Sequence, residues 1–522
     1  MMSETRVDSS SIAWCDDTRP CCSEFFPHPS TAAGQLEDST VTWRCRGSGQ
    51  RENTILRTQP VSYRGTSNRT MLMVVMLSAW LMVLGCRSER EDPNQPQASQ
   101  VDEPAVSSVP LRVVVAATHF DATAVNRHWL ASSEQAVEFR VVRPQELVDA
   151  SRLEADVVLY PARLLGELVA RQWIVKLPAA MIREQESPRP PASSVEAAAA
   201  GDRFLPPPAE QHQTRYGGVN YAVSLGITIP VLISSQRGPW DESTEGIDID
   251  SVLAALATDA DSHSMEIVEE RVDPEALVDR FLAVVGCCTR RSSKYGILFE
   301  MQTMRSRLRE PEFVQAVAVL QRLARQPGQG WRSVVGSHTD AWQWVLDADR
   351  FVVALIAPAL VADRSASAPQ ADVVPLRGHA DFPTTWNTGG GMVASMAAEC
   401  RQTAHATALL TWLGQTPTRN ALAPLVEGVS PTAPLAGADS LAWRAQQQVA
   451  RAAASNALPR EPSLVGAHAF RQALAQELLS AIRGEKSAER ALQDAHDAWQ
   501  QIVDAWGPRL RDRYEESLGL TL

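Results

Sequence analysis

The strongest constraint on the fold is a regular alternation of apolar runs and amphipathic stretches that begins at residue 111. Residues 111–117 (LRVVVAA), 137–142 and 155–160 read as strands, because each is a short run rich in apolar and β-branched residues. Stretches of helical periodicity follow at 124–132 and 162–171. Strands that alternate with helices form right-handed βαβ units, so we predict an α/β fold with a parallel sheet covered on both faces.

The next part of the chain predicts a second lobe of the same kind. Residues 217–226 (GGVNYAVSLG) carry glycines at both ends of a β-prone run, which predicts a hairpin that leads into a crossing strand. We expect lobe 1 to begin with residues 111–226, lobe 2 to span 227–350, and 351–420 to cross over and return to lobe 1. Further helices are predicted at 249–258, 274–286, 311–325, 338–347 and 404–413, and a strand at 351–356.

The C-terminal region, residues 421–522, is predicted to be helical and to pack on the lobes. Ser487 is placed to cap the start of the last clear helix, and Gly484 to end the helix before it. We interpret the two tryptophans of the last helix as packing residues. Its apolar residues are spaced three and four apart on one face: Leu492, Ala495, Trp499, Ile502 and Trp506.

A short apolar segment near the N-terminus predicts export. Residues 71–85 (MLMVVMLSAWLMVLG) follow Arg64 and Arg69 and stop at Cys86. Fifteen residues are short for a membrane span, which needs about 20, whereas a basic flank and a short apolar run are the parts of a secretory signal. The sequence Val-Leu-Gly-Cys resembles a bacterial lipobox, which implies lipidation of Cys86 and attachment to the periplasmic face of the cell envelope. A short anchor helix that ends in cysteine is the alternative.

The segments on either side of this signal look non-structural. Residues 1–70 lack periodicity and are either a start assigned too far upstream or a genuine disordered extension. Residues 87–110 are rich in polar residues and poor in large apolar ones, so they cannot offset the entropy of ordering and are expected to form a flexible tether.

Charge and cysteine content exclude several classes of protein. The formal net charge is −12, and it belongs to the chain after residue 85, which argues against nucleic acid as a partner. Cys287 and Cys288 have no CxxC partner and no histidine at ligand spacing, so buried apolar packing is favoured over a metal site. We expect neither a metal nor a cofactor.

Four stretches of sequence carry a family resemblance. They are 156–161 with its helix and the following WIVKLP, 217–224, 341–344 with the strand after it, and 404–413. In this order they resemble the extracellular solute-binding proteins of family 1, the maltose-binding-protein-like receptors of ABC transporters. The resemblance implies a two-lobed periplasmic-binding-protein-like (type II) fold with a helical C-terminal tail. It also implies a small solute, a sugar or oligosaccharide, bound between the lobes for uptake by the membrane permease of an ABC transporter.

The implied fold predicts where a ligand binds. Ligands of open α/β sheets lie at the carboxyl ends of strands, which here also points to Pro161 and Ala357. We expect Phe120, Tyr160 and Trp386 to be aromatic platforms and His119, Asp121 and Asn387 to bind through hydrogen bonds. The full predicted ligand-binding set is Thr118, His119, Phe120, Asp121, Tyr160, Trp240, Trp386 and Asn387.

Each of these residues also has a structural interpretation. Residues 118–121 are equally suited to capping the helix that follows them. Tyr160 is also explained as an ordinary strand end, Trp386 as a buried lobe residue, and Trp240 as a turn residue that covers the second lobe.

Three departures from the family pattern weaken the expectation of a sugar, and one of them is the run 231–235 (VLISS), where an aromatic-rich crossing strand is usual. Ser224 stands where sugar receptors commonly have proline, and the strand at 351–356 leads to Ala-Pro instead of Gly-Pro-Trp. No G-x-S-x-G, H-E-x-x-H or G-x-x-x-x-G-K motif is present, so we predict no catalytic residue and no enzyme. The alternatives are a lipid-anchored carbohydrate-active hydrolase and a non-transporting protein that has kept the receptor fold. A cleft with paired carboxylates at the spacing of a glycosidase would favour the hydrolase, whereas an aromatic, carboxylate-poor cleft would favour binding.

Overall fold

The structure is a computed structural model, and all the residues it describes fall within one compact unit, 101–522. Residues 1–108, which include the lipobox with Cys86, lie outside the described part, and so does Trp240. None of the described helices is both long and apolar enough to cross a membrane. The described residues are 109–178, 181, 208–236, 247–256, 271–289, 296–326, 330–357, 371–374, 376–377, 386–431, 441–453 and 458–520.

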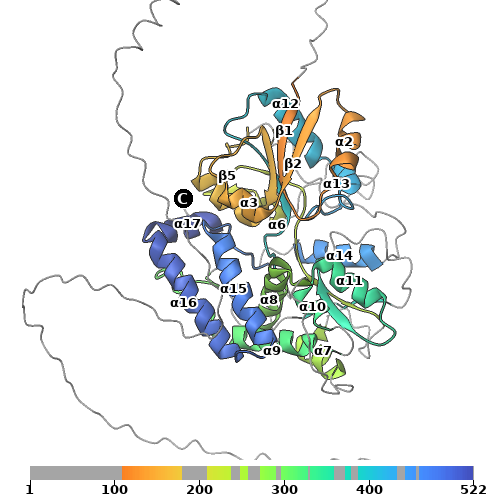
Figure 1. Cartoon of the computed structure of the whole chain (residues 1–522), viewed down its shortest axis with the longest axis vertical. Coiled ribbons are helices and arrows are strands. Elements are labelled where there is room, and N and C mark those ends of the chain that lie inside the picture. Colours follow the sequence, from red (N-terminus) through yellow and green to blue (C-terminus); the bar gives the residue numbers. More distant parts are fainter. Residues whose placement is uncertain are drawn as a thin grey trace, which may run out of the picture. The chain divides into compact units, whose positions relative to one another are not determined.

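Lobe 1 is the part of this unit built on a five-stranded sheet with strand order β2-β1-β3-β12-β6 (Figure 1). Strand β1 pairs in parallel with β2 and β3, as predicted, whereas β12 runs antiparallel to β3 and β6 because it returns from the second lobe. The strands are β1 (Leu111–Ala116), β2 (Val137–Val142), β3 (Val157–Pro161), β6 (Val223–Ser224) and β12 (Met392–Met396).

Helices cover both faces of this sheet, because its strands alternate their side chains between two cores. Leu111, Val113 and Val115 of β1 pack with the core on the side of α2 and α12, whereas Val114 and Ala116 pack with the core on the side of α3 and α4. The bounds are α2 (Ala122–Leu130), α3 (Pro144–Asp149), the 3₁₀ turn η1 (Ala162–Leu164), α4 (Leu165–Ala170), α12 (Thr403–Gly414) and α13 (Thr416–Leu422).

A short helix and a hairpin precede the crossing to the second lobe. The hairpin joins β4 (Arg215–Tyr216) to β5 (Val219–Asn220), and the helix is α6 (Pro208–Gln213). Gly217 and Gly218 form the turn with φ of +55° and +72°, the left-handed values that a two-residue hairpin of this kind needs. The predicted hairpin is therefore confirmed.

Lobe 2 is built on a three-stranded antiparallel sheet with strand order β10-β7-β9. Strand β9 pairs with β7 along its whole length, so the strand predicted at 351–356 belongs to lobe 2 and not to the return toward lobe 1. The strands are β7 (Val231–Ser234), β9 (Val353–Ile356) and β10 (Asp372–Val374), with the separate pair β8 (Ile247–Asp248) and β11 (Leu376–Arg377). The helices are α7 (Ile249–Leu256), α8 (Pro274–Cys288), α9 (Pro311–Ala324), α10 (Arg332–Val335) and α11 (His338–Leu346).

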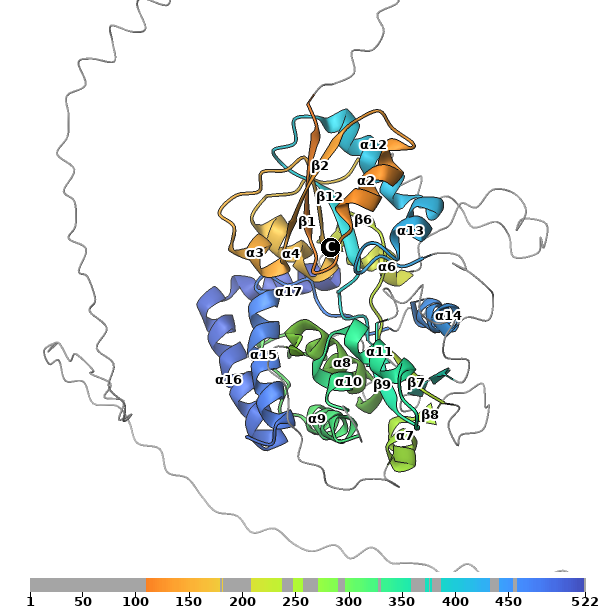
Figure 2. The ribbon, with the colours of Figure 1, turned by 45° about the vertical axis from the view of Figure 1, so that its right-hand side comes forward.

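The C-terminal helices are α14 (Leu441–Ala453), α15 (Ala467–Ile482), α16 (Ala488–Trp506) and α17 (Arg509–Leu518). Helix α14 packs on the sheet of lobe 2, while α15 and α16 form a pair beside α8 and α9 (Figure 2). Ser487 caps α16 as predicted, through a hydrogen bond from the Arg490 amide. Trp499 is buried in the core of lobe 2, but Trp506 is 48% exposed, which contradicts its interpretation as a packing residue.

The chain passes between the lobes where three glycines pack backbone against backbone. A Cβ atom on Gly391 would lie 2.4 Å from the carbonyl oxygen of Gly226, and one on Gly226 would lie 2.4 Å from that of Gly428. Both distances are shorter than a carbon–oxygen contact allows. The crossing segments can approach this closely only because these positions have no side chain.

Candidate functional site

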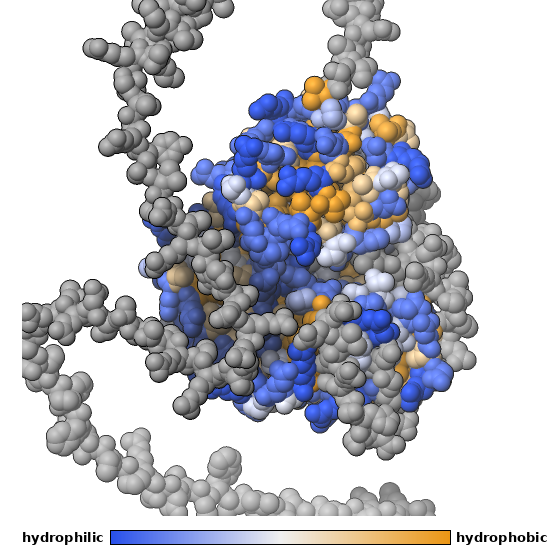
Figure 3. All heavy atoms as spheres, viewed as in Figure 1, coloured by the Kyte–Doolittle hydropathy of each residue, from blue (hydrophilic) through white to orange (hydrophobic). Residues whose placement is uncertain are grey.

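A cavity of about 310 Å³ lies between the two lobes. Figure 3 shows mainly hydrophilic residues along the junction of the lobes on the face that it displays. The wall is shared by strand ends of lobe 1, the start of α8 in lobe 2 and two positions of α15. It includes Ala116, Thr118, Arg143, Pro161, Arg163, Thr228, Asp273, Glu275, Asp279, His338, Ala357, Gly390, Glu427, His468 and Gln472.

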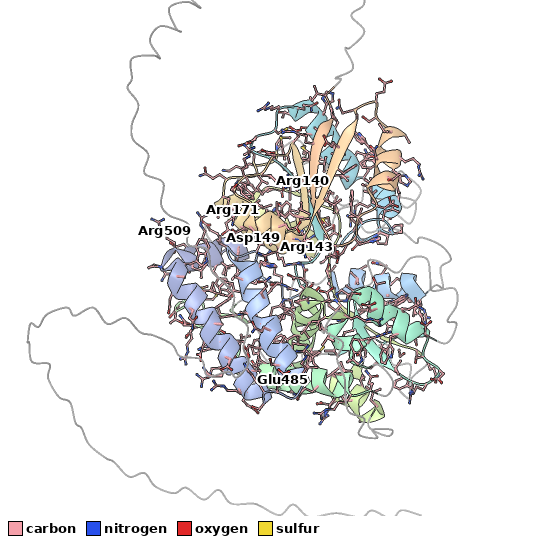
Figure 4. All side chains as sticks on the ribbon, viewed as in Figure 1. Arg140, Arg143, Asp149, Arg171, Glu485 and Arg509 are labelled. Carbon is pink, nitrogen blue, oxygen red and sulfur yellow. The ribbon has the colours of Figure 1, made fainter. Side chains whose placement is uncertain are left out.

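The lobe 1 wall is built at the carboxyl ends of its strands. Thr118 follows β1, and its amide donates to the Glu427 carboxylate at 3.0 Å while its hydroxyl makes a second hydrogen bond to the same oxygen. Arg143, which is labelled in Figure 4, follows β2 and precedes α3 on the side of lobe 1 nearest to α15. Pro161 and Arg163 follow in the same way from the end of β3. Strand ends thus carry both polar and basic groups to the cavity.

The lobe 2 wall is the first turn of α8. Asp273 is its N-cap, and its carboxylate accepts hydrogen bonds from the amides of Glu275 and Ala276 at 3.0 and 3.1 Å. Pro274 at the first helical position fits this start, since proline lacks the amide hydrogen that would otherwise be unpaired there. Glu275 and Asp279 are four residues apart and therefore lie on one face of the helix. That face lines the cavity.

A cluster of five charged side chains joins the two lobes beside the cavity. Arg163 of lobe 1 reaches Glu275 of lobe 2, with 3.1 Å between Nη2 and Oε2. Arg471 of α15 is buried and contacts three carboxylates, those of Glu275, Asp279 and Glu461, each at 2.5 Å. Two guanidinium groups thus serve three carboxylates.

The cluster shifts the acidity of its carboxyl groups in opposite directions. Burial acts to raise the pKa values of Glu275 and Asp279, but the neighbouring guanidinium groups outweigh it and hold both pKa values below their usual range. For Glu461, burial and the charges of those two carboxylates outweigh the attraction of Arg471. They raise its pKa to about 7.

Two histidines complete the wall. The amide of Ala357 donates to Nδ1 of His338 at 3.1 Å, which leaves the proton on Nε2, 3.4 Å from Asp279. His468 is 8% exposed, and its Nδ1 lies 3.3 Å from Oε1 of Glu275. Its Nε2 is buried and has no hydrogen-bond partner among the described residues.

Of the seven predicted ligand residues that the structure describes, one, Thr118, lies in the cavity wall. Ligand contact by Thr118 stays a prediction. His119 is exposed beside it, and its carbonyl oxygen accepts from the Glu427 amide at 3.1 Å. Asp121 is the N-cap of α2 and accepts from the Ala124 amide at 2.9 Å. Capping is thus the role that the structure shows for Asp121.

The aromatic residues that were predicted as platforms lie in the cores instead, which contradicts their predicted position in the cleft. Phe120 packs against Phe139, with 5.1 Å between ring centroids, in the α12-side core of lobe 1. Tyr160 is fully buried, and its hydroxyl bonds to Ser395 at 2.7 Å. Trp386 is 1% exposed and belongs to the core of lobe 2.

Asn387 is likewise outside the cavity. It is buried, and its side-chain oxygen accepts from the Gly389 amide at 3.1 Å. It shapes the turn at Gly389, where φ is +66°. Pro161 and Ala357, at the strand ends that the sequence also pointed to, do line the cavity.

The acidic residues of the wall were missed because they do not follow strands. The signal for the lobe 2 wall was Asp-Pro-Glu at the start of the helix predicted at 274–286, since such a helix start needs a capping carboxylate. Asp279 and Arg280 also stand out as charges within a helix that is otherwise apolar and buried. Arg280 donates to the carbonyl oxygens of Leu355, Val334, Gly336 and Ser337 and thereby holds lobe 2 together.

Comparison with known proteins places the fold. The sugar-binding protein MalE from the phytopathogen Xanthomonas citri is similar with a TM-score of 0.52 and 14% identity, over 78% of this chain and 98% of that chain. Maltose-bound MalE3 of T. maritima is similar with a TM-score of 0.53 and 13% identity, over 76% of this chain and 100% of that chain. A third similar structure is an ABC transporter solute-binding protein from Agrobacterium radiobacter in complex with ribitol. Its TM-score is 0.56 and its identity 14%, over 76% of this chain and 100% of that chain.

These similarities confirm the predicted fold class. The chain has an α/β, two-lobed periplasmic-binding-protein-like fold with a helical C-terminal tail. No protein-family model matches the sequence, and no curated protein matches it. The solved structures that resemble it are of binding proteins, and their sequence identities are low enough that the likeness concerns the fold alone.

Proposed function

We propose that this chain is a solute-binding protein that captures a small molecule between its lobes and delivers it to the permease of an ABC transporter. The cavity carries this proposal, because it lies at the carboxyl ends of lobe 1 strands, where open α/β sheets bind their ligands. Its volume is at the small end of the range of about 300 to 1,000 Å³ for ligand pockets. This size favours a single small solute over a long oligosaccharide.

The same proposal accounts for the N-terminal signal. Lipidation at Cys86 would hold a receptor close to the permease that it serves, through the tether of residues 87–110. Replacing Cys86 with serine is expected to leave an uncleaved precursor or to release the protein from the membrane fraction. Unchanged processing and unchanged membrane association would contradict the lipid anchor but not the binding function.

Ligand capture is tested by a thermal-shift screen of the purified full-length protein against sugars, polyols, amino acids and amines. A ligand at about 100 times its dissociation constant stabilises the folded state by about 2.7 kcal/mol, which such a screen detects. Absence of any hit across these classes would contradict the proposal. Release of the chromophore from nitrophenyl glycosides would favour the hydrolase alternative instead.

Two adjacent residues offer a matched pair for the position of the site. Thr118→Ala removes a hydroxyl that lines the cavity and holds Glu427, so it is expected to weaken binding of a hit about two- to tenfold. His119→Ala removes an exposed side chain outside the cavity wall and is expected to leave the affinity unchanged. Equal effects of both changes would place the ligand elsewhere.

A further inference from the structure

The wall of the cavity lacks the side chains that usually cover a sugar. No Phe, Tyr or Trp lines it among the residues that the structure describes. Aromatic faces cover the C–H patches of a sugar ring, and without them a neutral sugar gains little from this wall. Six charged side chains line it, among apolar and neutral polar residues.

The charges of the wall do not balance. Four carboxylates line the cavity, from Asp273, Glu275, Asp279 and Glu427, against the guanidinium groups of Arg143 and Arg163. Glu275 and Asp279 are already paired with Arg163 and Arg471. Asp273 and Glu427 form no ion pair with Arg or Lys among the described residues. Asp273 feels the positive charge of the nearby Arg280, so these two are the wall carboxylates that lack a direct ion pair but not every favourable charge.

Asp273 and Glu427 come from opposite lobes and affect each other. Burial raises the pKa of Asp273 and outweighs the lowering effect of the Ala276 amide and of the His338 and Arg280 side chains, and the charge of Glu427 adds to the rise. Both are held in place by hydrogen bonds, Asp273 by the α8 amides and Glu427 by Thr118. Two fixed, unpaired carboxylates on facing walls make an electrostatic cost that a cation between them would remove.

A third group supports a ligand with N–H donors. The ring of His468 is nine-tenths buried, lines the same cavity, and has no described partner for its Nε2. A neutral imidazole nitrogen without a proton is an acceptor, so it can take an N–H bond from an ammonium group. No set of three or more His, Cys, Asp or Glu side chains in the described residues is arranged to hold a metal ion.

We propose that the cavity selects a small solute that carries an ammonium group, which is held between Asp273 of lobe 2 and Glu427 of lobe 1. This inference rests on the proposed binding function and names its substrate class. When the lobes close around the solute, both carboxylates contact the same ammonium group. An amine-bearing solute therefore stabilises the closed arrangement, whereas a neutral one of the same size leaves the two negative charges unneutralised.

The test compares solutes that differ in one amine. Calorimetric titration of the full-length protein uses glucosamine against glucose and N-acetylglucosamine, and 1,4-diaminobutane against 1,4-butanediol, with maltose and ribitol added as neutral probes. We expect at least one amine to bind and its neutral counterpart to bind at least about tenfold more weakly, as for the loss of a charged hydrogen bond.

Two variants locate the amine, and a third is their control. Asp273→Asn and Glu427→Gln each remove a charge but keep an acceptor oxygen for the local hydrogen bonds, and each is expected to weaken amine binding about tenfold or more. Because they lie in different lobes, one remains informative if the other fails to fold. Asp121→Asn makes the same change at the N-cap of α2, outside the cavity, and should leave binding unchanged.

The outcomes separate this inference from the function on which it rests. Neutral probes that bind as well as their amine counterparts would overturn the charge preference and leave solute binding intact. Amine binding that survives both cavity variants would also overturn it, since the ammonium would then lie elsewhere on this acidic protein. No binding by any probe would overturn the inference and count against the proposed function as well.

Discussion

The interior of lobe 1 and the cleft between the lobes both bury arginine and carboxylate side chains, but only the interior balances them. Inside lobe 1, Arg419 makes two bonds of 3.0 Å to Glu210, whose carboxylate also accepts from Ser224. Beside the cleft, Arg471 is shared among three carboxylates, and the wall adds Asp273 and Glu427.

The difference shows in which region of the protein carboxylates outnumber the guanidinium groups that compensate them. A buried ion pair with one partner for each charge holds a fold together without excess charge. A cluster with more carboxylates than guanidinium groups is destabilising unless something else compensates it. The excess lies where a solute can enter, which is the pattern of a binding site and not of a core.

The largest expected effect comes from removing the shared guanidinium. Arg471→Met leaves three carboxylates, two of them buried, without their common partner and is expected to lower the free energy of unfolding by about 4 to 5 kcal/mol. Arg419→Met leaves a single carboxylate, which keeps its bond from Ser224, and is expected to cost about 3 kcal/mol. Urea unfolding of both variants measures the difference.

A paired change sharpens this contrast. Adding Glu210→Met to Arg419→Met removes the orphaned charge and should restore most of the stability, because the replaced pair leaves no uncompensated group. Adding Glu461→Gln to Arg471→Met should restore less, since Glu275 and Asp279 remain. Equal recovery of stability in the two double variants would show that the charges of the cluster compensate each other as fully as those of the Arg419–Glu210 pair.

The second effect is a pH dependence confined to the cleft cluster. The pKa of Glu461 is raised from 4.5 to about 7, so the folded state binds its proton more tightly than the unfolded state does. Its contribution to stability is present below pH 4.5 and is lost as the pH rises to about 7. Glu461→Gln cannot ionise and so does not show this loss. Between pH 4.5 and about 7, the free energy of unfolding of the wild type should therefore fall by about 1 to 3 kcal/mol relative to that of the variant.

Urea unfolding at several pH values between 4 and 8 tests this prediction. Glu210→Gln in lobe 1 is the control for changing a buried carboxylate that has one arginine partner. Parallel pH curves for wild type and Glu461→Gln would show that Glu461 is ionised throughout.

A smaller effect is expected from the interior of lobe 1. Tyr160→Phe leaves the Ser395 hydroxyl without its partner in a buried site, which should cost about 1 to 2 kcal/mol. Solute affinity should not change, because Tyr160 lies outside the cavity wall. A variant that keeps its stability but binds solute more weakly would show that Tyr160 belongs to the binding site and not to the interior of lobe 1.

The smallest effect is expected at the rim of the cleft. The Gln472 amide donates to the Gln145 side chain at 3.2 Å across an exposed gap between α15 and lobe 1. Gln472→Ala and Gln145→Ala should each change the free energy of unfolding by less than about 0.5 kcal/mol. A loss above 2 kcal/mol would show that exposed rim contacts, and not the buried cluster, hold the lobes together.

Much of this architecture could be predicted from the sequence, because periodicity reports burial. The strand at 137–142 and the helices at 249–256, 311–324 and 338–346 lie within two residues of their predicted positions. The strand-end rule also located part of the cavity. It failed at Tyr160 by a single position: side chains alternate along a strand, so Tyr160 points into the core while Pro161 reaches the cavity.

The remaining site residues could not be predicted because they meet only in three dimensions. Asp273 begins a helix, Glu427 follows another, and His468 belongs to the C-terminal region. No local pattern connects these three positions. Trp386 was misplaced for a related reason, since nothing near it in the sequence shows that the core of lobe 2 closes over its ring.

The position of β12 has a consequence for how the chain acquires its fold. This strand lies between β3 and β6, yet it is synthesised only after all the described strands of lobe 2. Until then β3 presents an unpaired edge, and such edges invite pairing with other chains. Contacts between segments so far apart also slow folding. Neither lobe can therefore be produced from one contiguous fragment, and a nascent or truncated chain that ends before residue 392 should be aggregation-prone.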